Sequence, residues 1–202
     1  MVEGLLGTPL KVESRADLCA FMAGRAAFVS QKAMFEYCRA RAGVMWDKLM
    51  LEADFVAGLE RGRWQAYVAA LADLALVCDV AIRAGGCAPQ PAALGDVAAE
   101  VLGAEPRLAQ AGVAVAPEVA AIRLSLDRAA MAPPRRVHEI AVRAGGRIYA
   151  LMPIHPDMRR HDETTIVNNV RFLMVRAYED LAQGLDPARL GAELGRAARD
   201  GA

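Results

Sequence analysis

Apolar residues recur along most of the chain at intervals of three and four, the spacing that places them on one face of a helix. Over residues 15–42 the bulkiest of them, Phe21, Phe28 and Phe35, lie seven residues apart and are therefore expected to form one ridge. No segment alternates between apolar and polar residues with the period of two that is typical of a strand. The pattern predicts an all-α fold without a sheet.

Glycines and prolines divide this pattern into a bundle of about six to eight helices. Arg61-Gly62 is interpreted as a turn, and Gly85-Gly86 as the end of a helix. Gly145-Gly146 is expected to stop a later helix in the same way. Asp186-Pro187 combines an N-cap residue with proline at the first helical position, which favours a final helix from that point. The other helices are expected over 15–42, 44–59, 63–84, 92–102, 118–130, 135–144 and 162–183.

A length of 202 residues is enough to bury one hydrophobic core, and the sequence is interpreted as a single helical domain. The main core is expected over 15–86, which carries most of the large side chains, with 1–14 as an N-terminal arm. Residues 87–134 are rich in Pro and Ala and are interpreted as a connector with short helices. Residues 135–202 supply the C-terminal helices.

The charge balance narrows the choice of partners. Lys+Arg and Asp+Glu number 24 each, so the formal net charge is zero. A domain that binds DNA or RNA usually carries a basic surplus for the phosphates, so nucleic acid is not expected as a partner. Hydrophobic residues make up 55% of the chain. So much apolar surface with so little net charge favours self-association or docking on a protein partner.

Three features predict a cytoplasmic protein. The first residues lack the basic and apolar regions of a secretory signal. The most apolar run, Leu71 to Ile82, is interrupted by Asp73 and Asp79, so no transmembrane segment is expected. The four cysteines show no Cys-x-x-Cys spacing and are interpreted as reduced thiols buried in the core.

Polar chemistry gathers in residues 153–172, PIHPDMRRHDETTIVNNVRF, which hold two of the three histidines and both asparagines. His155, Asp157 and His161 are of types that bind divalent metals, and with Asn168 and Asn169 they form the candidate polar site. The structural alternative is a solvated loop followed by the start of a helix. Because the spacing matches no metal-binding signature, no metal is assigned.

The same segment contains a basic doublet. Arg159 and Arg160 could bind an anionic group such as a phosphate or carboxylate, and could converge with Arg135-Arg136 on one ligand. Solvated surface arginines are the ordinary alternative. Asp162 and Glu163, which follow the doublet, are placed to complement the positive end of a helix dipole.

Catalytic and cofactor signatures are missing from the sequence. None of the serines lies in Gly-x-Ser-x-Gly, and no glycine-rich nucleotide loop follows a strand, so no catalytic residue and no cofactor are assigned. The ridge of Phe21, Phe28 and Phe35 is the candidate interaction face, as a groove for a partner helix. Packing in the core is the alternative role for residues at this spacing.

Three strings carry a resemblance to a known group of proteins. FVSQKAMFEYCRARAG (Phe28–Gly43), the Arg63-Trp64 pair that follows it and NNVRF (Asn168–Phe172) are similar to uncharacterised all-helical proteins of alphaproteobacteria, some with an automatic "esterase" label. The likeness covers roughly the first eighty residues and the helix after Asp162. It implies a bacterial, cytoplasmic, helical protein and brings no established chemistry. The nucleophile elbow that such an esterase requires is missing.

Two hypotheses of function follow. The first is a non-enzymatic helical interaction or assembly protein, which predicts an exposed patch of Leu, Met and Phe. The alternative is a small hydrolase or metal-dependent enzyme that uses the His155, Asp157 and His161 segment, which predicts that these side chains point into one pocket.

Overall fold

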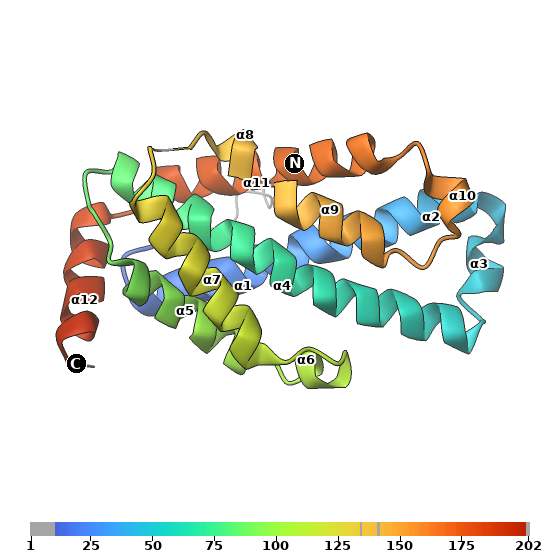
Figure 1. Ribbon diagram of the computed structural model, residues 1–202, viewed down its shortest axis with the longest axis horizontal. Coiled ribbons are helices and arrows are strands. Elements are labelled where there is room, and N and C mark those ends of the chain that lie inside the picture. The colour runs from blue at the N-terminus through green and yellow to red at the C-terminus, as the bar shows by residue number, and fades with distance from the viewer. Residues whose placement is uncertain (1–10, 134, 141, 201–202) are drawn as a thin grey trace, which may run out of the picture.

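The computed structural model describes residues 11–133, 135–140 and 142–200, without the side chains of 142 and 196–200. These residues are almost entirely helical and form no strand, which confirms the all-α prediction (Figure 1). One isolated bridge joins Val12 to Leu185, and the Val12 backbone N–H donates to the Gly184 carbonyl oxygen at 2.9 Å. Residues 1–10 of the predicted arm lie outside the described residues.

The described residues form more helical segments than the six to eight predicted, because several are single turns of four residues. The single turns are α3 (Trp46–Leu49), α6 (Arg107–Gln110), α8 (Val137–Ile140) and α10 (Pro156–Arg159). The longer helices are α1 (Arg15–Gln31), α2 (Tyr37–Ala42), α4 (Ala53–Ala84), α5 (Pro91–Gly103), α7 (Val115–Ala130), α9 (Val142–Leu151), α11 (Glu163–Gly184) and α12 (Pro187–Asp200). A π-helical segment, η1 (Lys32–Glu36), joins α1 to α2, and a 3-10 turn, η2 (Gly43–Met45), leads into α3.

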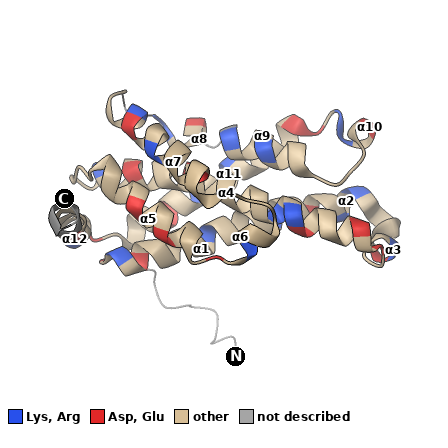
Figure 2. Ribbon diagram, turned by 60° about the horizontal axis from the view of Figure 1, so that its bottom comes forward, with Lys and Arg blue, Asp and Glu red and all other residues tan. Residues whose placement is uncertain are grey.

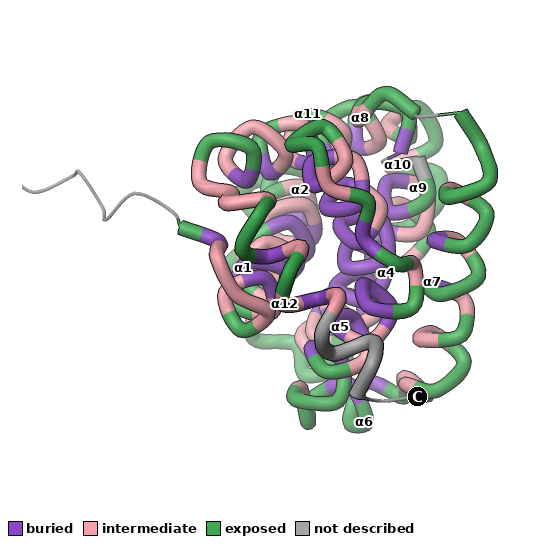
Figure 3. The backbone as a smooth tube through the Cα atoms, turned by 90° about the vertical axis from the view of Figure 1, so that its left-hand side faces the viewer, coloured by how far each residue is buried: buried purple, intermediate pink, exposed green. Residues whose placement is uncertain are grey.

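Helix α4 lies at the centre of the bundle, and α1, α7, α9 and α11 pack around it (Figure 1). Every residue from Ala66 to Ala75 is buried, and the helix is the most continuously buried element in Figure 3. By length and composition α4 could cross a membrane. However, 83% of its most apolar window is buried inside the protein, which is the environment of a central helix in a packed domain.

The turn predicted at Arg61-Gly62 is wrong, and so is the helix predicted over 44–59. Helix α4 continues through Gly62, and the chain turns at residues 50–52 instead. A Cβ on Gly62 would lie 2.7 Å from Met34 Cε and 2.9 Å from the Leu151 carbonyl oxygen. Gly62 therefore permits the close approach of two neighbouring segments and does not end a helix.

Gly145-Gly146 shows the same kind of error. The predicted stop lies inside α9, which runs on to Leu151. A Cβ on Gly145 would meet the Val167 Cα at 2.8 Å, whereas a Cβ on Gly146 would meet nothing within 4 Å. Gly145 thus allows the backbones of α9 and α11 to pack closely.

Helices α5 and α7 form a layer on one side of the bundle. They pack against each other, and α5 also contacts α1 while α7 contacts α4. Leu94 and Leu102 of α5 and Ile122 and Leu126 of α7 are buried in this layer. The segment interpreted as a connector therefore contributes side chains to the hydrophobic core.

Candidate functional site

His155 and Asp157 of the candidate polar site lie at the start of α10, and both are exposed. The His155 Nδ1 accepts a hydrogen bond from the Asp157 backbone N–H at 3.3 Å and lies 3.5 Å from Asp157 Oδ2. The two side chains are 69% and 83% exposed. His155 therefore acts as the N-cap of a single helical turn, a local structural role.

His161, in the turn between α10 and α11, is also exposed. Among the described residues, no three His, Cys, Asp or Glu side chains are grouped so that they could hold a metal ion. The metal-dependent alternative therefore has no ligand set in the part of the chain that the structure describes.

The two arginines of the anion-binding candidate differ in environment. The Arg159 guanidinium lies 4.7 Å from the centroid of the Tyr149 ring and donates to the carbonyl oxygens of Ile154, at 3.1 Å, and of Tyr149. These bonds hold α10 against the end of α9. Arg160 is exposed. The Arg135-Arg136 doublet precedes α8, at the opposite end of α9, so the two doublets do not converge on one ligand.

The three phenylalanines of the candidate interaction face do not share one environment. Phe21 is buried, Phe28 is 49% exposed, and Phe35 packs edge-on against Trp46 with ring centroids 6.4 Å apart. Phe35 lies in η1, whose wider π-helical turn changes the angular position of the residues that follow Phe28. The ridge expected from a regular α-helix is therefore broken after Phe28.

Phe28 lines a groove of about 800 Å³ between α1, η1 and α2 on one side and α11 on the other. Phe172 of α11, which is 64% exposed, lines the same groove. Tyr37 and Leu173 are half-buried and add apolar surface to it. This groove is the candidate functional site, because two large aromatic side chains are left in solvent across one hollow.

Asn168 and Asn169 of α11 differ in their position relative to the groove. Asn169 lines the groove. Asn168 lies outside it, is exposed and accepts a hydrogen bond from Arg171 Nη1 at 3.3 Å. Of the five residues in the candidate polar site, only Asn169 lines the groove.

Charged side chains surround the aromatic residues of the groove, and most of them are neutralised by a partner. Exposed ion pairs of this kind contribute little to stability, but they leave the groove with little net charge. The pairs are Arg25–Asp180 at 2.6 Å, Lys32–Glu36 at 3.3 Å, Arg176–Glu179 at 3.0 Å and Arg41–Asp162.

Asp162 lines the groove and joins α2 to the start of α11. Its Oδ2 accepts hydrogen bonds from the Tyr37 hydroxyl at 2.5 Å and from Arg41 Nε at 2.6 Å. The Arg41 guanidinium, and then the Tyr37 hydroxyl, hold the pKa of this carboxyl below its usual range. Burial and the hydrogen bond to Asp162 raise the pKa of Tyr37. Asp162 occupies the N-cap position of α11 but makes no side-chain cap; it binds across to another helix.

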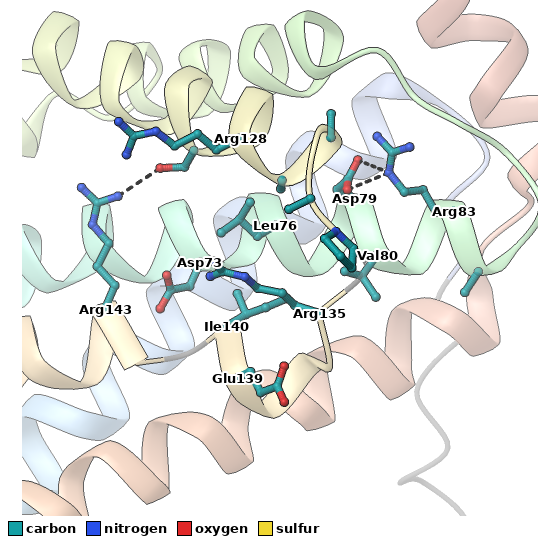
Figure 4. A pocket seen from close by; sticks show the side chains of 16 residues that line it. Asp73, Leu76, Asp79, Val80, Arg83, Arg128, Arg135, Glu139, Ile140 and Arg143 are labelled. Carbon is teal, nitrogen blue, oxygen red and sulfur yellow. Dashed lines mark hydrogen bonds and ion pairs between the residues drawn. The ribbon is translucent and has the colours of Figure 1, made fainter.

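A second hollow, a cleft of about 830 Å³, lies between α4, α7 and the segment that leads through α8 to α9 (Figure 4). Asp73 and Asp79, the acidic residues that interrupt the apolar run of α4, line this cleft. In the sequence alone, these two residues argue against a transmembrane segment but indicate no site. A carboxylate within the most apolar stretch of a chain is itself a signal, because its burial is costly without a compensating role.

Comparisons of the chain with protein-family models, with curated proteins and with solved structures found no match. The resemblance to alphaproteobacterial helical proteins therefore stays a prediction.

Proposed function

We propose that the protein is a non-enzymatic helical interaction protein of the bacterial cytoplasm that docks an apolar segment of a partner in the α1–α11 groove. The observation that carries this proposal is the exposure of Phe28 and Phe172, at 49% and 64%, in one hollow. Aromatic side chains supply large contact areas at interfaces and tend to be the residues that bind most strongly.

The surroundings of the two phenylalanines indicate the chemistry of the partner. The aromatic surface is ringed by charges of both signs, the arrangement of an interface with an apolar centre and a polar rim. The charged residues lining the groove are Arg25, Lys32, Arg41 and Arg176 against Glu36, Asp162 and Asp180, which gives a net charge of +1. Positions of basic and acidic residues are also interspersed over the helices in Figure 2. A nearly neutral partner segment is therefore favoured.

A helix from the partner is the occupant that suits a groove between two helices. Its apolar residues at spacings of three and four would contact Phe28 and Phe172. A second copy of this chain would satisfy the same description, so self-association is a second form of the same proposal.

The thiols support a cytoplasmic location. The four cysteines are free, and Cys38 and Cys78 are buried. Burial raises the pKa of Cys38 to about 12, so this thiol stays protonated and unreactive near neutral pH.

Site-specific photo-crosslinking in cells tests the proposal. A benzoylphenylalanine placed at Phe172 should give a discrete adduct, and Phe28→Ser should abolish it because the partner loses its second contact. The same probe at Leu124, an exposed residue of α7 outside the groove, is the matched control. An adduct of twice the chain mass would identify self-association. Equal adducts from both positions, or none from Phe172, would contradict the proposal.

A further inference from the structure

The cleft between α4, α7 and the segment through α8 to α9 holds charges that the groove-docking proposal does not use. Asp73 is 1% exposed, within an otherwise apolar stretch of α4. Its Oδ2 accepts a hydrogen bond from the Ala144 backbone N–H at 2.9 Å, and no described group donates to Oδ1. Burial raises the pKa of Asp73 to about 7, against the smaller opposing effects of that hydrogen bond and of Arg143.

Three arginines line the cleft without a carboxylate partner among the described residues: Arg128 of α7, Arg135 before α8 and Arg143 of α9. Arg143 Nη1 donates to the Ser125 hydroxyl at 3.2 Å, and that hydroxyl donates to the Ala121 carbonyl oxygen at 2.8 Å. This differs from Arg83, whose Nε donates to both oxygens of Asp79 at 2.9 and 2.8 Å (Figure 4).

The cleft differs from the groove in how its charges are paired. With every group ionised the net charge of the lining is +1 in both hollows, and that of the cleft becomes +2 when Asp73 carries a proton. Of the four arginines that line the cleft, Arg83 alone has a carboxylate partner among the described residues. Positive charge focused in a concave site attracts anions, and guanidinium groups bind carboxylate and phosphate oxygens through several hydrogen bonds.

The remainder of the wall is apolar. Leu76 and Val80 of α4, Ala129 of α7 and Ile140 of α8 line the cleft with apolar side chains, and Leu76, Val80 and Ile140 are labelled in Figure 4. A cleft of about 830 Å³ is within the size range of sites for organic molecules. The wall therefore suits a ligand that has an apolar body attached to a charged group.

We propose that this cleft binds a small amphiphilic anion, with its oxyanion head held by Arg128 and Arg143 and its apolar body against Leu76, Val80 and Ile140. Asp73 lies next to the head: its ionised carboxylate repels the oxyanion, whereas its protonated carboxyl donates a hydrogen bond to it. The site is independent of the groove, and neither proposal depends on the other.

Titration calorimetry of the full chain tests the site with decanoate and decyl phosphate, each below its micelle concentration. At least one of them should bind with one molecule per chain, and the tighter one identifies the head group. The Arg128→Gln/Arg143→Gln variant should bind at least about tenfold more weakly, because two charged hydrogen-bond donors are lost. Decanol, which lacks the charge, should bind more weakly than either anion.

Arg123→Gln is the matched control, because it removes one positive charge from the same helix outside the cleft, where Arg123 pairs with Asp96 at 2.6 Å. This variant should bind as the parent chain does. Absence of saturable binding by both anions, unchanged affinity in the double variant, or equal affinity for decanol would overturn the proposal.

The binding should also tighten as the pH falls from 8 to 6, because a protonated Asp73 no longer repels the head group. Asp73→Asn should remove this dependence. His138→Gln is needed as a control, since imidazoles titrate in the same range and His138 adjoins Glu139. A dependence that survives in Asp73→Asn would overturn the role of Asp73. The charged groups that share the cleft with Asp73 are Asp79, Arg83, Arg128, Arg135, Glu139 and Arg143.

Discussion

The groove and the cleft have nearly the same volume, about 800 and 830 Å³, but they differ in how their charges are matched. In the groove each arginine has a carboxylate partner, and what stays exposed is aromatic: Phe28 and Phe172. None of the described residues that line the cleft is aromatic. A carboxyl group is buried there, and Arg128, Arg135 and Arg143 have no partner among the described carboxylates.

Because of this difference, we propose different ligands for two hollows of nearly equal size. Matched charges around exposed apolar surface leave hydrophobic contact as the main source of binding energy, which suits a protein segment. Unmatched arginines around a partly apolar wall leave charge to be neutralised, which suits a small anion. The volumes of the groove and the cleft do not distinguish them.

The largest expected effect is a difference between Asp73 of the cleft and Asp162 of the groove in how each makes the free energy of unfolding depend on pH. Asp73 has a raised pKa in the folded chain, so the folded state binds the proton more tightly than the unfolded one, and stability is lost as the pH rises toward 7. Between pH 5 and pH 8 this loss is about 2–3 kcal/mol. Asp73→Asn should lack it, as measured by urea unfolding at both pH values.

Asp162 supplies the contrast in the groove. Its pKa is lowered, so its contribution is present above the ordinary pKa of an aspartate and is lost only in acid. Asp162→Asn should therefore change stability equally at pH 5 and pH 8. If the parent chain and Asp73→Asn lost the same stability between pH 5 and pH 8, the pKa of the cleft carboxyl would not be perturbed.

The next effect concerns the close contact between α9, which lines the cleft, and α11, which lines the groove. Gly145 of α9 approaches α11 so closely that an added Cβ would lie 2.8 Å from the Val167 Cα, while Gly146 has free space. We expect Gly145→Ala to lower the free energy of unfolding by about 1–2 kcal/mol through overpacking. Gly146→Ala should raise it by up to about 1 kcal/mol through helix propensity. Equal effects would contradict the close contact of α9 and α11.

A smaller effect on stability is expected from the hydrogen bond between Tyr37 and Asp162 in the groove. Tyr37→Phe removes the hydroxyl that donates to Asp162 at 2.5 Å but keeps the ring. The expected loss is about 1 kcal/mol, the usual value for one hydrogen bond to a group that keeps a second partner. Chemical denaturation measures it. No loss would indicate that Arg41 alone holds Asp162.

The smallest effect on stability is expected at Phe172. Because its side chain is 64% exposed, Phe172→Ser should change the free energy of unfolding by less than about 0.5 kcal/mol. Crosslinking through a probe at Phe28 should nevertheless be lost. A large loss of stability would instead indicate that Phe172 is part of the core.

Periodicity predicted the helical regions well where one face of a helix is buried throughout. The regions expected at 15–42 and 162–183 correspond to α1 through α2 and to α11. The helix ends predicted at Gly62 and Gly145 are wrong, because that prediction considers only the cost of a glycine to its own helix. Their role depends on Leu151 and Val167, which belong to neighbouring segments and cannot be identified from local pattern.

The sites were harder to predict for a related reason. Residues 153–172 are predicted to hold the site because of their histidines, but His155 caps a short helix. Of the five candidate polar residues, only Asn169 lines the groove. The acidic residue at position 73 was visible in the apolar run. Its arginine neighbours come from α7 and α9, more than fifty residues away in the chain, so the cleft could not be assembled from sequence.

The most direct test of the proposal that the anion binds in the cleft and not in the groove is a titration of decanoate into two double variants. Arg128→Gln/Arg143→Gln alters the cleft, and Phe28→Ser/Phe172→Ser alters the groove. We predict at least about a tenfold loss of affinity in the first variant and less than about a twofold change in the second. Equal losses in both variants, or a loss confined to the groove variant, would contradict the assignment of the anion to the cleft.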